Sequence, residues 1–439
     1  MRHATAIVAR ATVVGLVLLT AACHDLLTPT LPAGTSDPSS VKTEAGALAL
    51  RRGVIARSAD ALTLFVAASG LLTDELEAGT RGRSGGSIDP SMYADERILP
   101  EPPVSTLSST LDEPYGDLQV VRGEALGAIG ALRTYAPAQP PALTAEMYAL
   151  QGYAEVMLAD LYCSGVPLST LDFEGDFTYR AGSSTPEVYQ HAVVLFDTAL
   201  VLAAADSQIL NLARVGRGRA LLALSHYAEA AAAVAAVPDG YRYQLSMSWR
   251  GGATGGPMVT TTVSDREGTN GLAFISSGDP RTASHQTGIN EFGLPQYFAD
   301  KYGDPTAQLP ITLASGVEAR LIESEAALQA GDPSTWLATL NHLRATAIAP
   351  ALPDTTDPGT PDGRVALLFR ERAFWLFLTG HRQGDLRRVI RQYHRPQNAV
   401  YPTGVFDGGR GLYGADVTAA IPAQEHVNPL FTGCLDREP

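Results

Sequence analysis

Residues 210–238, LNLARVGRGRALLALSHYAEAAAAVAAVP, contain the pattern that decides the fold. Small and apolar residues, Gly218 and Ala220 among them, repeat at helical spacing in the first half, and the second half is rich in alanine. The three residues 225–227 separate the halves, and small side chains let two antiparallel helices approach closely. A helix–turn–helix unit of this kind is typical of the tetratricopeptide repeat, whose period is about 34 residues.

A second unit of the same kind occupies residues 317–347, VEARLIESEAALQAGDPSTWLATLNHLRATA. The run Gly331-Asp332-Pro333 predicts the turn, and Trp336 begins the apolar stripe of its second helix. Further segments have helical periodicity, namely 47–78, 115–136, 143–169 and 185–204. The sequence therefore predicts a mostly α protein with a tetratricopeptide-like helical-repeat scaffold.

Long irregular segments interrupt this scaffold. Residues 239–316 have little helical periodicity, and we expect a loop-rich insertion there with a few short strands. Residues 348–363 and 395–433 also have loop composition. Long ordered loops on a helical scaffold usually have a functional role, so ligand contacts are expected in these segments.

The N-terminus has the features of a targeting sequence. Basic residues precede a short apolar run, Ala11 to Leu19, which is too short to span a bilayer and predicts a secretion signal over residues 1–22. Cys23 follows the small residues of LLTAAC, as in a bacterial lipoprotein signal, so cleavage would leave a lipidated Cys23 at the new N-terminus. The alternative is an ordinary signal peptide that is cleaved nearby. Residues 23–42 have the composition of a flexible tether, and the folded body is expected over 43–439.

Composition limits the classes of partner. Hydrophobic residues make up 45% of the 439 and charged residues 18%, which is enough for a substantial core. The net charge of −14 argues against nucleic acid, which requires a basic surface. The same charge disfavours electrostatic docking on anionic lipid.

Several of these segments, in this order, resemble the SusD/RagB family of bacterial surface lipoproteins. They are the lipoprotein cysteine, MYALQGYAEVMLADLYCSGVPLS (147–169), GRGRALLALSHYAEA (216–230), residues 318–346, RERAFWLFLTGHRQGDLRR (370–388) and IPAQEHVNPL (421–430). The resemblance implies a SusD-like helical domain in a non-enzymatic protein without a cofactor, anchored by lipid to the outer face of the outer membrane. It also implies that the protein captures an oligosaccharide, or a peptide, for a SusC-like TonB-dependent transporter. The alternative function is a helical-repeat surface scaffold that assembles proteins and binds no small ligand.

The charged segment GHRQGDLRR (380–388) could be a catalytic or phosphate-binding site, but no nucleophile or paired base accompanies it. We interpret it as structural. Gly380 suits the left-handed position just past a helix end. Arg382, Asp385 and Arg387 are spaced to tie that end to the next helix by charged hydrogen bonds. The motif match GRSGG (82–86) lacks the strand and helix of a nucleophile elbow, and GGATGG (251–256) lacks the Lys-Ser/Thr of a phosphate-binding loop.

No metal site is predicted. DFEGD, from Asp172 to Asp176, clusters three carboxylates without the ligand spacing of a calcium loop, and a solvated loop is the preferred interpretation over a cation site.

Aromatic residues in the irregular segments are the candidates for ligand binding, because sugar rings present apolar faces on which aromatic rings stack. These candidates are Trp249, Tyr241, Tyr243, Tyr93, Tyr297 and Tyr302. Core packing is the alternative for each of them taken singly, and we expect at least one of the set to contact the ligand. Trp336 and Trp375 lie at apolar helical positions and are expected in the core.

Cys163 and Cys434 remain once Cys23 is lipidated. An even pair in an oxidising compartment predicts a disulfide, which would fasten the C-terminal tail to the scaffold. The alternative is two independent thiols, with Cys163 buried and Cys434 in a mobile end.

Overall fold

The structure is a computed structural model that describes residues 41–79, 90–99, 109–246, 261–289, 293–302, 310–406 and 411–438. Several predicted features lie outside these residues. They are the signal peptide, Cys23, most of the tether, Trp249 and the glycine-rich segments 82–86 and 251–256. The structure therefore does not test the predictions made for these residues.

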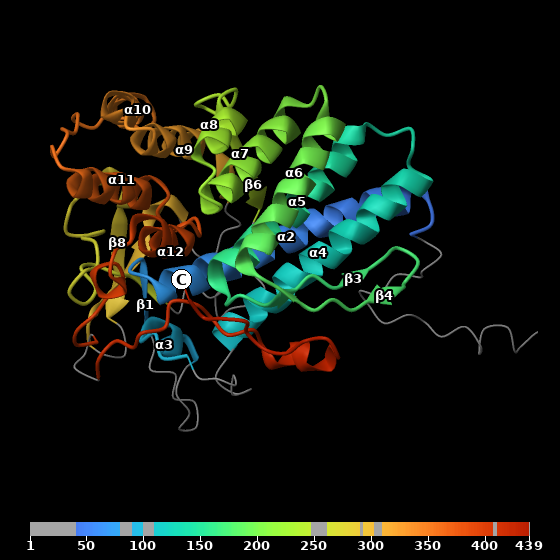
Figure 1. The fold of residues 1–439 in the computed structure, drawn as a ribbon, viewed down its shortest axis with the longest axis horizontal. Helices are drawn as coiled ribbons and strands as arrows, with labels where there is room; N and C mark the ends of the chain where they lie inside the picture. The colour runs from blue at the N-terminus through green and yellow to red at the C-terminus, as the bar shows by residue number, and fades with distance from the viewer. Residues whose placement is uncertain are drawn as a thin grey trace, which may run out of the picture.

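The described chain is mostly helical, as predicted, and successive helices pack side by side in one array (Figure 1). The array is formed by α4 (Ser109–Tyr135), α5 (Pro141–Leu161), α6 (Thr185–Ala203), α7 (Ser207–Ala223), α8 (Tyr227–Val234), α9 (Gly316–Gln329) and α10 (Pro333–Thr346). The first described helix, α2 (Glu44–Leu72), packs against α4 and α5. It begins just after the predicted start of the folded body, and the hydroxyl of Thr43 accepts a hydrogen bond from the Gly46 N–H at 3.0 Å.

Both predicted hairpins are confirmed. In the α7–α8 hairpin, a Cβ on Gly218 would lie 2.5 Å from Val234 Cγ1, so only glycine permits this approach of the two helices. Ser225 turns the chain between them with φ of +65°. In the α9–α10 hairpin, Gly331 takes φ of +75° and the Asp332 carboxylate caps α10 by accepting the Thr335 N–H at 3.0 Å.

The insertion between α8 and α9 contains short strands, as predicted. They are β6 (Arg242–Ser246), β7 (Thr261–Val263), β8 (Ser284–Ile289), β9 (Pro295–Ala299) and β10 (Pro310–Ser315), with the 3₁₀ turns η1 (Pro280–Thr282) and η2 (Asp300–Tyr302). β6 and β10 form an antiparallel ribbon in which Gln244 lies opposite Thr312 and Arg242 opposite Ser315. β10 leads directly into α9, so the ribbon is fixed to the helical array at one end.

Smaller elements cover other parts of the array. β1 (Leu76–Ala78) pairs with β7, and β8 pairs with β9. Two further strand pairs fill the α5–α6 connection: β2 (Val166–Pro167) pairs with β5 (Gly182–Ser183), and β3 (Thr170–Leu171) pairs with β4 (Phe177–Thr178). The short helix α3 is Pro90–Asp95. Each sheet in the described part of the chain has two strands, so the helices rather than the strands supply the framework.

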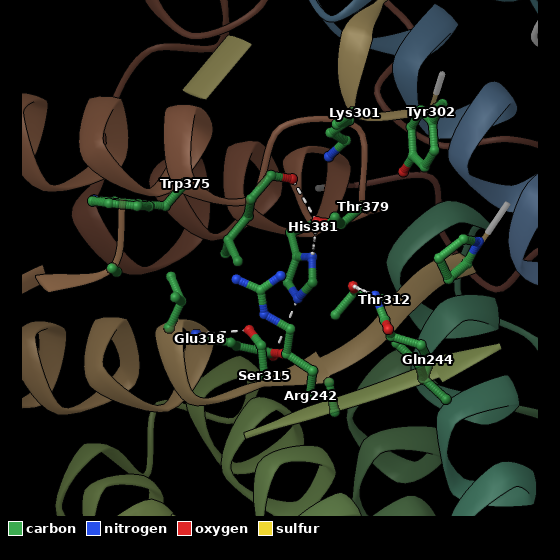
Figure 2. Close-up of a pocket in the computed structure, with 16 residues that line it drawn as sticks. Arg242, Gln244, Lys301, Tyr302, Thr312, Ser315, Glu318, Trp375, Thr379 and His381 are labelled. Carbon is green, nitrogen blue, oxygen red and sulfur yellow. Dashed lines mark hydrogen bonds and ion pairs between the residues drawn. The ribbon is translucent and has the colours of Figure 1, made fainter. Parts of the chain in front are cut away.

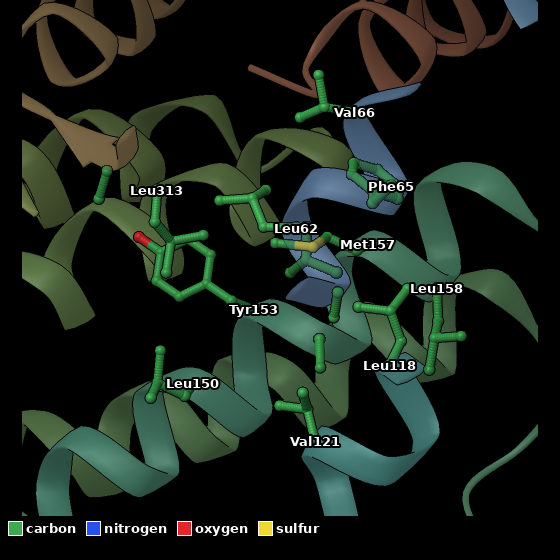
Figure 3. Close-up of a cluster of buried hydrophobic side chains, with 14 of the residues drawn as sticks. Leu62, Phe65, Val66, Leu118, Val121, Leu150, Tyr153, Met157, Leu158 and Leu313 are labelled. Carbon is green, nitrogen blue, oxygen red and sulfur yellow. The ribbon is translucent and has the colours of Figure 1, made fainter. Parts of the chain in front are cut away.

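The main hydrophobic core runs through the helical array, and Figure 3 shows the part of it that lies between α2, α4, α5 and the ribbon. Phe65 from α2, Leu118 from α4 and Leu313 from β10 are each 2% exposed or less. Burial of each such side chain contributes about 1.5–3 kcal/mol. By length and composition α2 could span a membrane, but 78% of the relevant window is buried inside the protein, which identifies α2 as a core helix.

The C-terminal part consists of α11 (Pro361–Trp375), α12 (Arg382–Tyr393) and an irregular tail with the 3₁₀ turns η3 (Gln397–Ala399) and η4 (Ala423–Val427). The tail returns to the end of α5, where Cys163 and Cys434 form the predicted disulfide with 5.8 Å between their Cα atoms. Backbone bridges from Tyr162 to Ala419 and from Ser164 to Asp436 flank this disulfide. The tail is thereby fastened to the repeat scaffold.

Candidate functional site

The charged segment 380–388 connects buried elements. Asp385 accepts two hydrogen bonds from Arg372 of α11, at 2.8 and 2.9 Å, and a third from Arg388 at 2.8 Å. Burial by itself would raise the pKa of Asp385, but the two guanidinium groups outweigh it and hold that pKa far below its usual range. Arg388 also pairs with Glu325 of α9 at 2.5 Å, so this network joins three helices.

Two arginines of the segment bind partners other than those predicted. Arg382 forms a bidentate ion pair with Asp74, just after α2, at 2.6 and 2.8 Å. Arg387 donates to the carbonyl oxygens of Ala159 and Asp160 at the end of α5. Of the three residues, only Asp385 links α12 to α11 as expected. Arg382 and Arg387 point instead toward α2 and α5, which pack against α12. The structural interpretation of the segment holds with this correction.

Gly380 takes the predicted left-handed conformation with φ of +80°. A Cβ at this position would also lie 2.6 Å from Cε1 of Phe65. The turn between α11 and α12 therefore requires glycine for its conformation and for its contact with the main core.

A cleft of about 260 Å³ lies where the β6–β10 ribbon meets the start of α9 and the α11–α12 turn (Figure 2). Its lining is a mixture of charged, hydroxyl, amide and aromatic side chains. Those with functional groups are Arg242, Gln244, Lys301, Tyr302, Thr312, Ser315, Glu318, Trp375, Thr379 and His381. A concave site with a few convergent polar groups and an aromatic side chain is the usual form of a small-molecule site.

Glu318 is the acid of this cleft, and its charge is fully matched. Arg219 donates two hydrogen bonds to its carboxylate, at 2.6 and 2.8 Å, and His381 Nε2 lies 3.1 Å from Oε1. Burial would raise the pKa of Glu318, but Arg219 and His381 lower it to about 2. Glu318 is therefore ionised at neutral pH and has no proton to donate.

His381 and Lys301 are also held by the protein. Burial, with Arg219 nearby, lowers the pKa of His381, and its Nδ1 lies 2.8 Å from the Thr379 hydroxyl. The Lys301 ammonium donates to the Phe377 carbonyl. Burial lowers the pKa of Lys301 to about 8, although the carboxylate of Glu75 opposes this. The Lys301 ammonium and His381 Nδ1 thus have partners within the protein, and His381 Nε2 faces the Glu318 carboxylate.

Trp375 was expected in the core, and this interpretation is wrong in part. Its ring packs against a second cluster of buried apolar side chains, which includes Leu340 and Leu368. The Arg281 guanidinium lies 4.9 Å from the ring centroid. The side chain is only half-buried, however, and its remaining surface lines the cleft. A position near the end of α11 explains this, because the helix stops there and leaves one side of the ring uncovered. Trp336 is fully buried, as predicted.

The tyrosine candidates have different positions. Tyr302 lines the cleft, but it is 3% exposed and its hydroxyl donates to the Leu378 carbonyl. Tyr241 is buried and donates to the Gln208 carbonyl at 2.9 Å, and Tyr243 donates to Glu146 at 2.6 Å. Tyr93 and Tyr297 are half-buried against the main core. The described tyrosines are thus distributed over the molecule, and Tyr302 alone among them lies at this cleft.

Arg242, Gln244 and Thr312 line the cleft although no sequence motif pointed to them. Side chains alternate between the two faces of a strand, so Arg242 and Gln244 share one face of β6 and Tyr243 and Leu245 the other. Leu245 is 1% exposed and marks the core face. The alternation of polar and apolar residues in 242–245, RYQL, could have identified these residues, because it places Arg242 and Gln244, rather than Tyr243, on the solvent-facing side of the strand.

Among the described residues, no group of three or more His, Cys, Asp or Glu side chains is arranged to hold a metal ion. The Asp172–Asp176 turn connects β3 and β4 at the surface, and the Asp172 carboxylate accepts the N–H groups of Gly175 and Asp176 at 2.9 and 2.8 Å. Its geometry is that of a hydrogen-bonded surface turn.

No protein-family model matches the sequence, and the comparison with curated proteins finds no match. Solved structures, by contrast, share the fold over almost its whole length. A SusD superfamily protein from Bacteroides fragilis is 13% identical with a TM-score of 0.65, and the match covers 89% of this chain and 99% of that chain. A SusD superfamily protein from Bacteroides thetaiotaomicron is 15% identical with a TM-score of 0.64, covering 90% and 100%.

A laminarin-binding SusD-like protein also matches, with 15% identity, a TM-score of 0.61, and coverage of 90% of this chain and 99% of that chain. These similarities establish that the chain has a SusD-like fold, as the sequence resemblance implied.

Proposed function

We propose that this protein binds an oligosaccharide at the cleft between the β6–β10 ribbon and α11, and that it does so without catalysis. The observation that supports the proposal is the composition of the cleft. The amide of Gln244 and the hydroxyl of Thr312 lie opposite each other on the ribbon, and the Trp375 ring forms part of the wall. Sugars require this combination, because their hydroxyl groups need hydrogen-bond partners and their apolar faces stack on aromatic rings.

The fold supports the same proposal, since similar solved structures include a SusD-like carbohydrate-binding protein and a laminarin-binding SusD-like protein. Binding rather than hydrolysis is favoured by the state of Glu318. A glycoside hydrolase needs one protonated and one ionised carboxyl group on either side of the scissile bond. Glu318 is ionised and held by Arg219, so this cleft lacks the general acid among its described lining residues.

The proposal extends to location and partner. Cleavage before Cys23 would give a lipid-anchored protein at the surface of the outer membrane, with a SusC-like TonB-dependent transporter as the partner that receives the oligosaccharide. A Cys23→Ser change in the full chain should release the protein from the outer-membrane fraction. Continued partition of that variant with the membrane would refute the anchor.

The binding proposal is tested by calorimetry of the full chain against a panel of oligosaccharides, β-glucan fragments and uronates included. Gln244→Ala should weaken binding of any panel member that binds, about three- to tenfold, without changing the melting temperature, because Gln244 is exposed. Gln329→Ala is the matched control, since Gln329 is exposed at the opposite end of α9. A panel in which no oligosaccharide binds would overturn the proposal in favour of the surface scaffold.

A further inference from the structure

The Arg242 side chain differs from every other charged group of the cleft. Figure 2 shows it extending from β6 into the middle of the cleft, with Trp375 and His381 around it. No described residue forms a hydrogen bond or an ion pair with its guanidinium, and the residue is exposed. Its five N–H donors are therefore available to a ligand.

The remaining ionisable groups explain why Arg242 is free. Glu318 is the carboxylate that lines the same cleft, and Arg219 already occupies both of its oxygens. Lys301 is held by the Phe377 carbonyl, and His381 lies between Glu318 and Thr379. The cleft thus contains one uncommitted positive charge and no uncommitted negative charge among its described lining residues.

The backbone adds to this positive character. Ser315, Val317 and Glu318 line the cleft at the start of α9, so the positive end of the helix dipole is directed toward it. The 14 residues of α9 make this a full helix rather than a single turn. An arginine fork and a helix N-terminus together favour a planar anion, and a carboxylate matches the fork with two parallel hydrogen bonds.

We propose that Arg242 binds the carboxylate of a uronic acid, so that the ligand of the cleft is an acidic oligosaccharide. This inference rests on the proposed function and narrows its ligand class. The surrounding groups favour a uronate over a peptide carboxylate, since Gln244, Thr312 and Ser315 supply amide and hydroxyl partners for ring hydroxyls. The cleft volume of about 260 Å³ lies below the usual range of about 300–1,000 Å³, so a short segment such as the acidic end of a chain fits it.

The test compares three ligands by calorimetry with the full chain: a uronate oligosaccharide, the same oligosaccharide with its carboxyl groups reduced to alcohols, and a neutral β-glucan fragment. The uronate should bind about two- to fivefold more tightly than its reduced form, the range expected for a charge pair with an exposed arginine. Arg242→Gln should remove that difference. Arg242→Lys should restore part of it, because lysine keeps the charge but not the fork.

Arg52→Gln is the matched control, since Arg52 is an exposed arginine of α2 that lies outside the cleft and likewise has no partner among the described residues. It should leave all affinities unchanged. Arg242→Gln should also melt at the wild-type temperature, since no interaction within the described structure is lost.

The outcomes separate the two proposals. Equal binding of the uronate and its reduced form, or an Arg242→Gln variant that binds the uronate as wild type does, overturns the carboxylate assignment and leaves glycan binding intact. Absence of binding by all three ligands overturns the proposed function itself. A peptide that binds through a free C-terminus, and loses binding when amidated, would overturn the uronate as the source of the carboxylate.

Discussion

Replacing Asp385 with asparagine tests the structural role of segment 380–388. The substitution keeps the shape of the side chain but removes its charge, and leaves Arg372 and Arg388 facing a neutral amide in a buried position. Breaking a buried ion pair by removing one partner costs about 3–5 kcal/mol, because the other charge stays buried without compensation. We therefore expect a large loss of stability from Asp385→Asn.

The expected change in melting temperature follows from chain length. An unfolding entropy of about 2.1 cal/mol/K per residue over roughly 400 residues gives about 0.8 kcal/mol per degree. A loss of about 3–5 kcal/mol then corresponds to a decrease of about 4–6 °C. Asp362→Asn is the matched control, because Asp362 is 83% exposed and pairs with Arg395 at 3.0 Å. A surface pair of this kind is worth about 0–1 kcal/mol, so the control should melt within about 1 °C of wild type.

Thermal unfolding followed by circular dichroism at several pH values provides the assay. Because the pKa of Asp385 is depressed in the folded state, its stabilising contribution is present above the unfolded value of 3.8 and is lost as pH falls below it. The difference between wild type and Asp385→Asn should therefore narrow in acid. A variant that melts with wild type at pH 7, or one that keeps its stability and loses glycan binding, would refute the structural interpretation.

Two further predictions concern the disulfide and Glu75. Changing Cys434 to serine should lower the melting temperature by about 2–6 °C, since removing a native disulfide typically costs 2–5 kcal/mol. A reductant should lower the melting temperature of wild type but not that of the variant. Alkylation of Cys163 and Cys434 in unreduced wild type would contradict the disulfide. Burial raises the pKa of Glu75 to about 7, so its contribution to stability is present below 4.5 and is lost as pH rises through 7. The melting temperature of wild type should therefore fall between pH 5.5 and 7.5, and that of Glu75→Gln should fall less, as measured by the same assay. An equal fall in both proteins would exclude Glu75 as the cause of the pH dependence.

The helical part of the fold could be predicted because its determinants are local. Helix periodicity, turn residues and small residues each act within a single hairpin of about 34 residues, as Gly218 does in the α7–α8 hairpin and Gly331 in the α9–α10 hairpin. The cap of α2 at Thr43 and the left-handed Gly380 are also decided by neighbours within a few positions. The disulfide between Cys163 and Cys434 is a long-range contact that could also be predicted. With Cys23 assigned to lipid, these two cysteines had only each other as possible disulfide partners.

The cleft could not be predicted in the same way, because it depends on contacts between distant segments. Gln244 and Thr312 are brought together by a ribbon whose strands are 68 residues apart, and the Arg219–Glu318 pair joins residues 99 apart. Composition favoured tyrosines as ligand contacts, yet strand alternation directs Tyr243 toward Glu146 and the core. Trp375 was predicted to lie in the core because of its apolar position on a helix. The ring is partly exposed because α11 ends at this residue.

The charged residues of segment 380–388 and Arg242 of the cleft differ in whether the protein supplies a partner for their charge. Arg382, Arg388 and Asp385 are each matched by a partner inside the protein, so truncating any one of them should reduce stability. Arg242 is matched by none of the described residues, so truncating it should cost no stability and should change only binding. Melting temperature and affinity therefore vary independently between these two groups, and measuring both on the same variants distinguishes a charge that holds the fold from a charge that is kept free for a ligand.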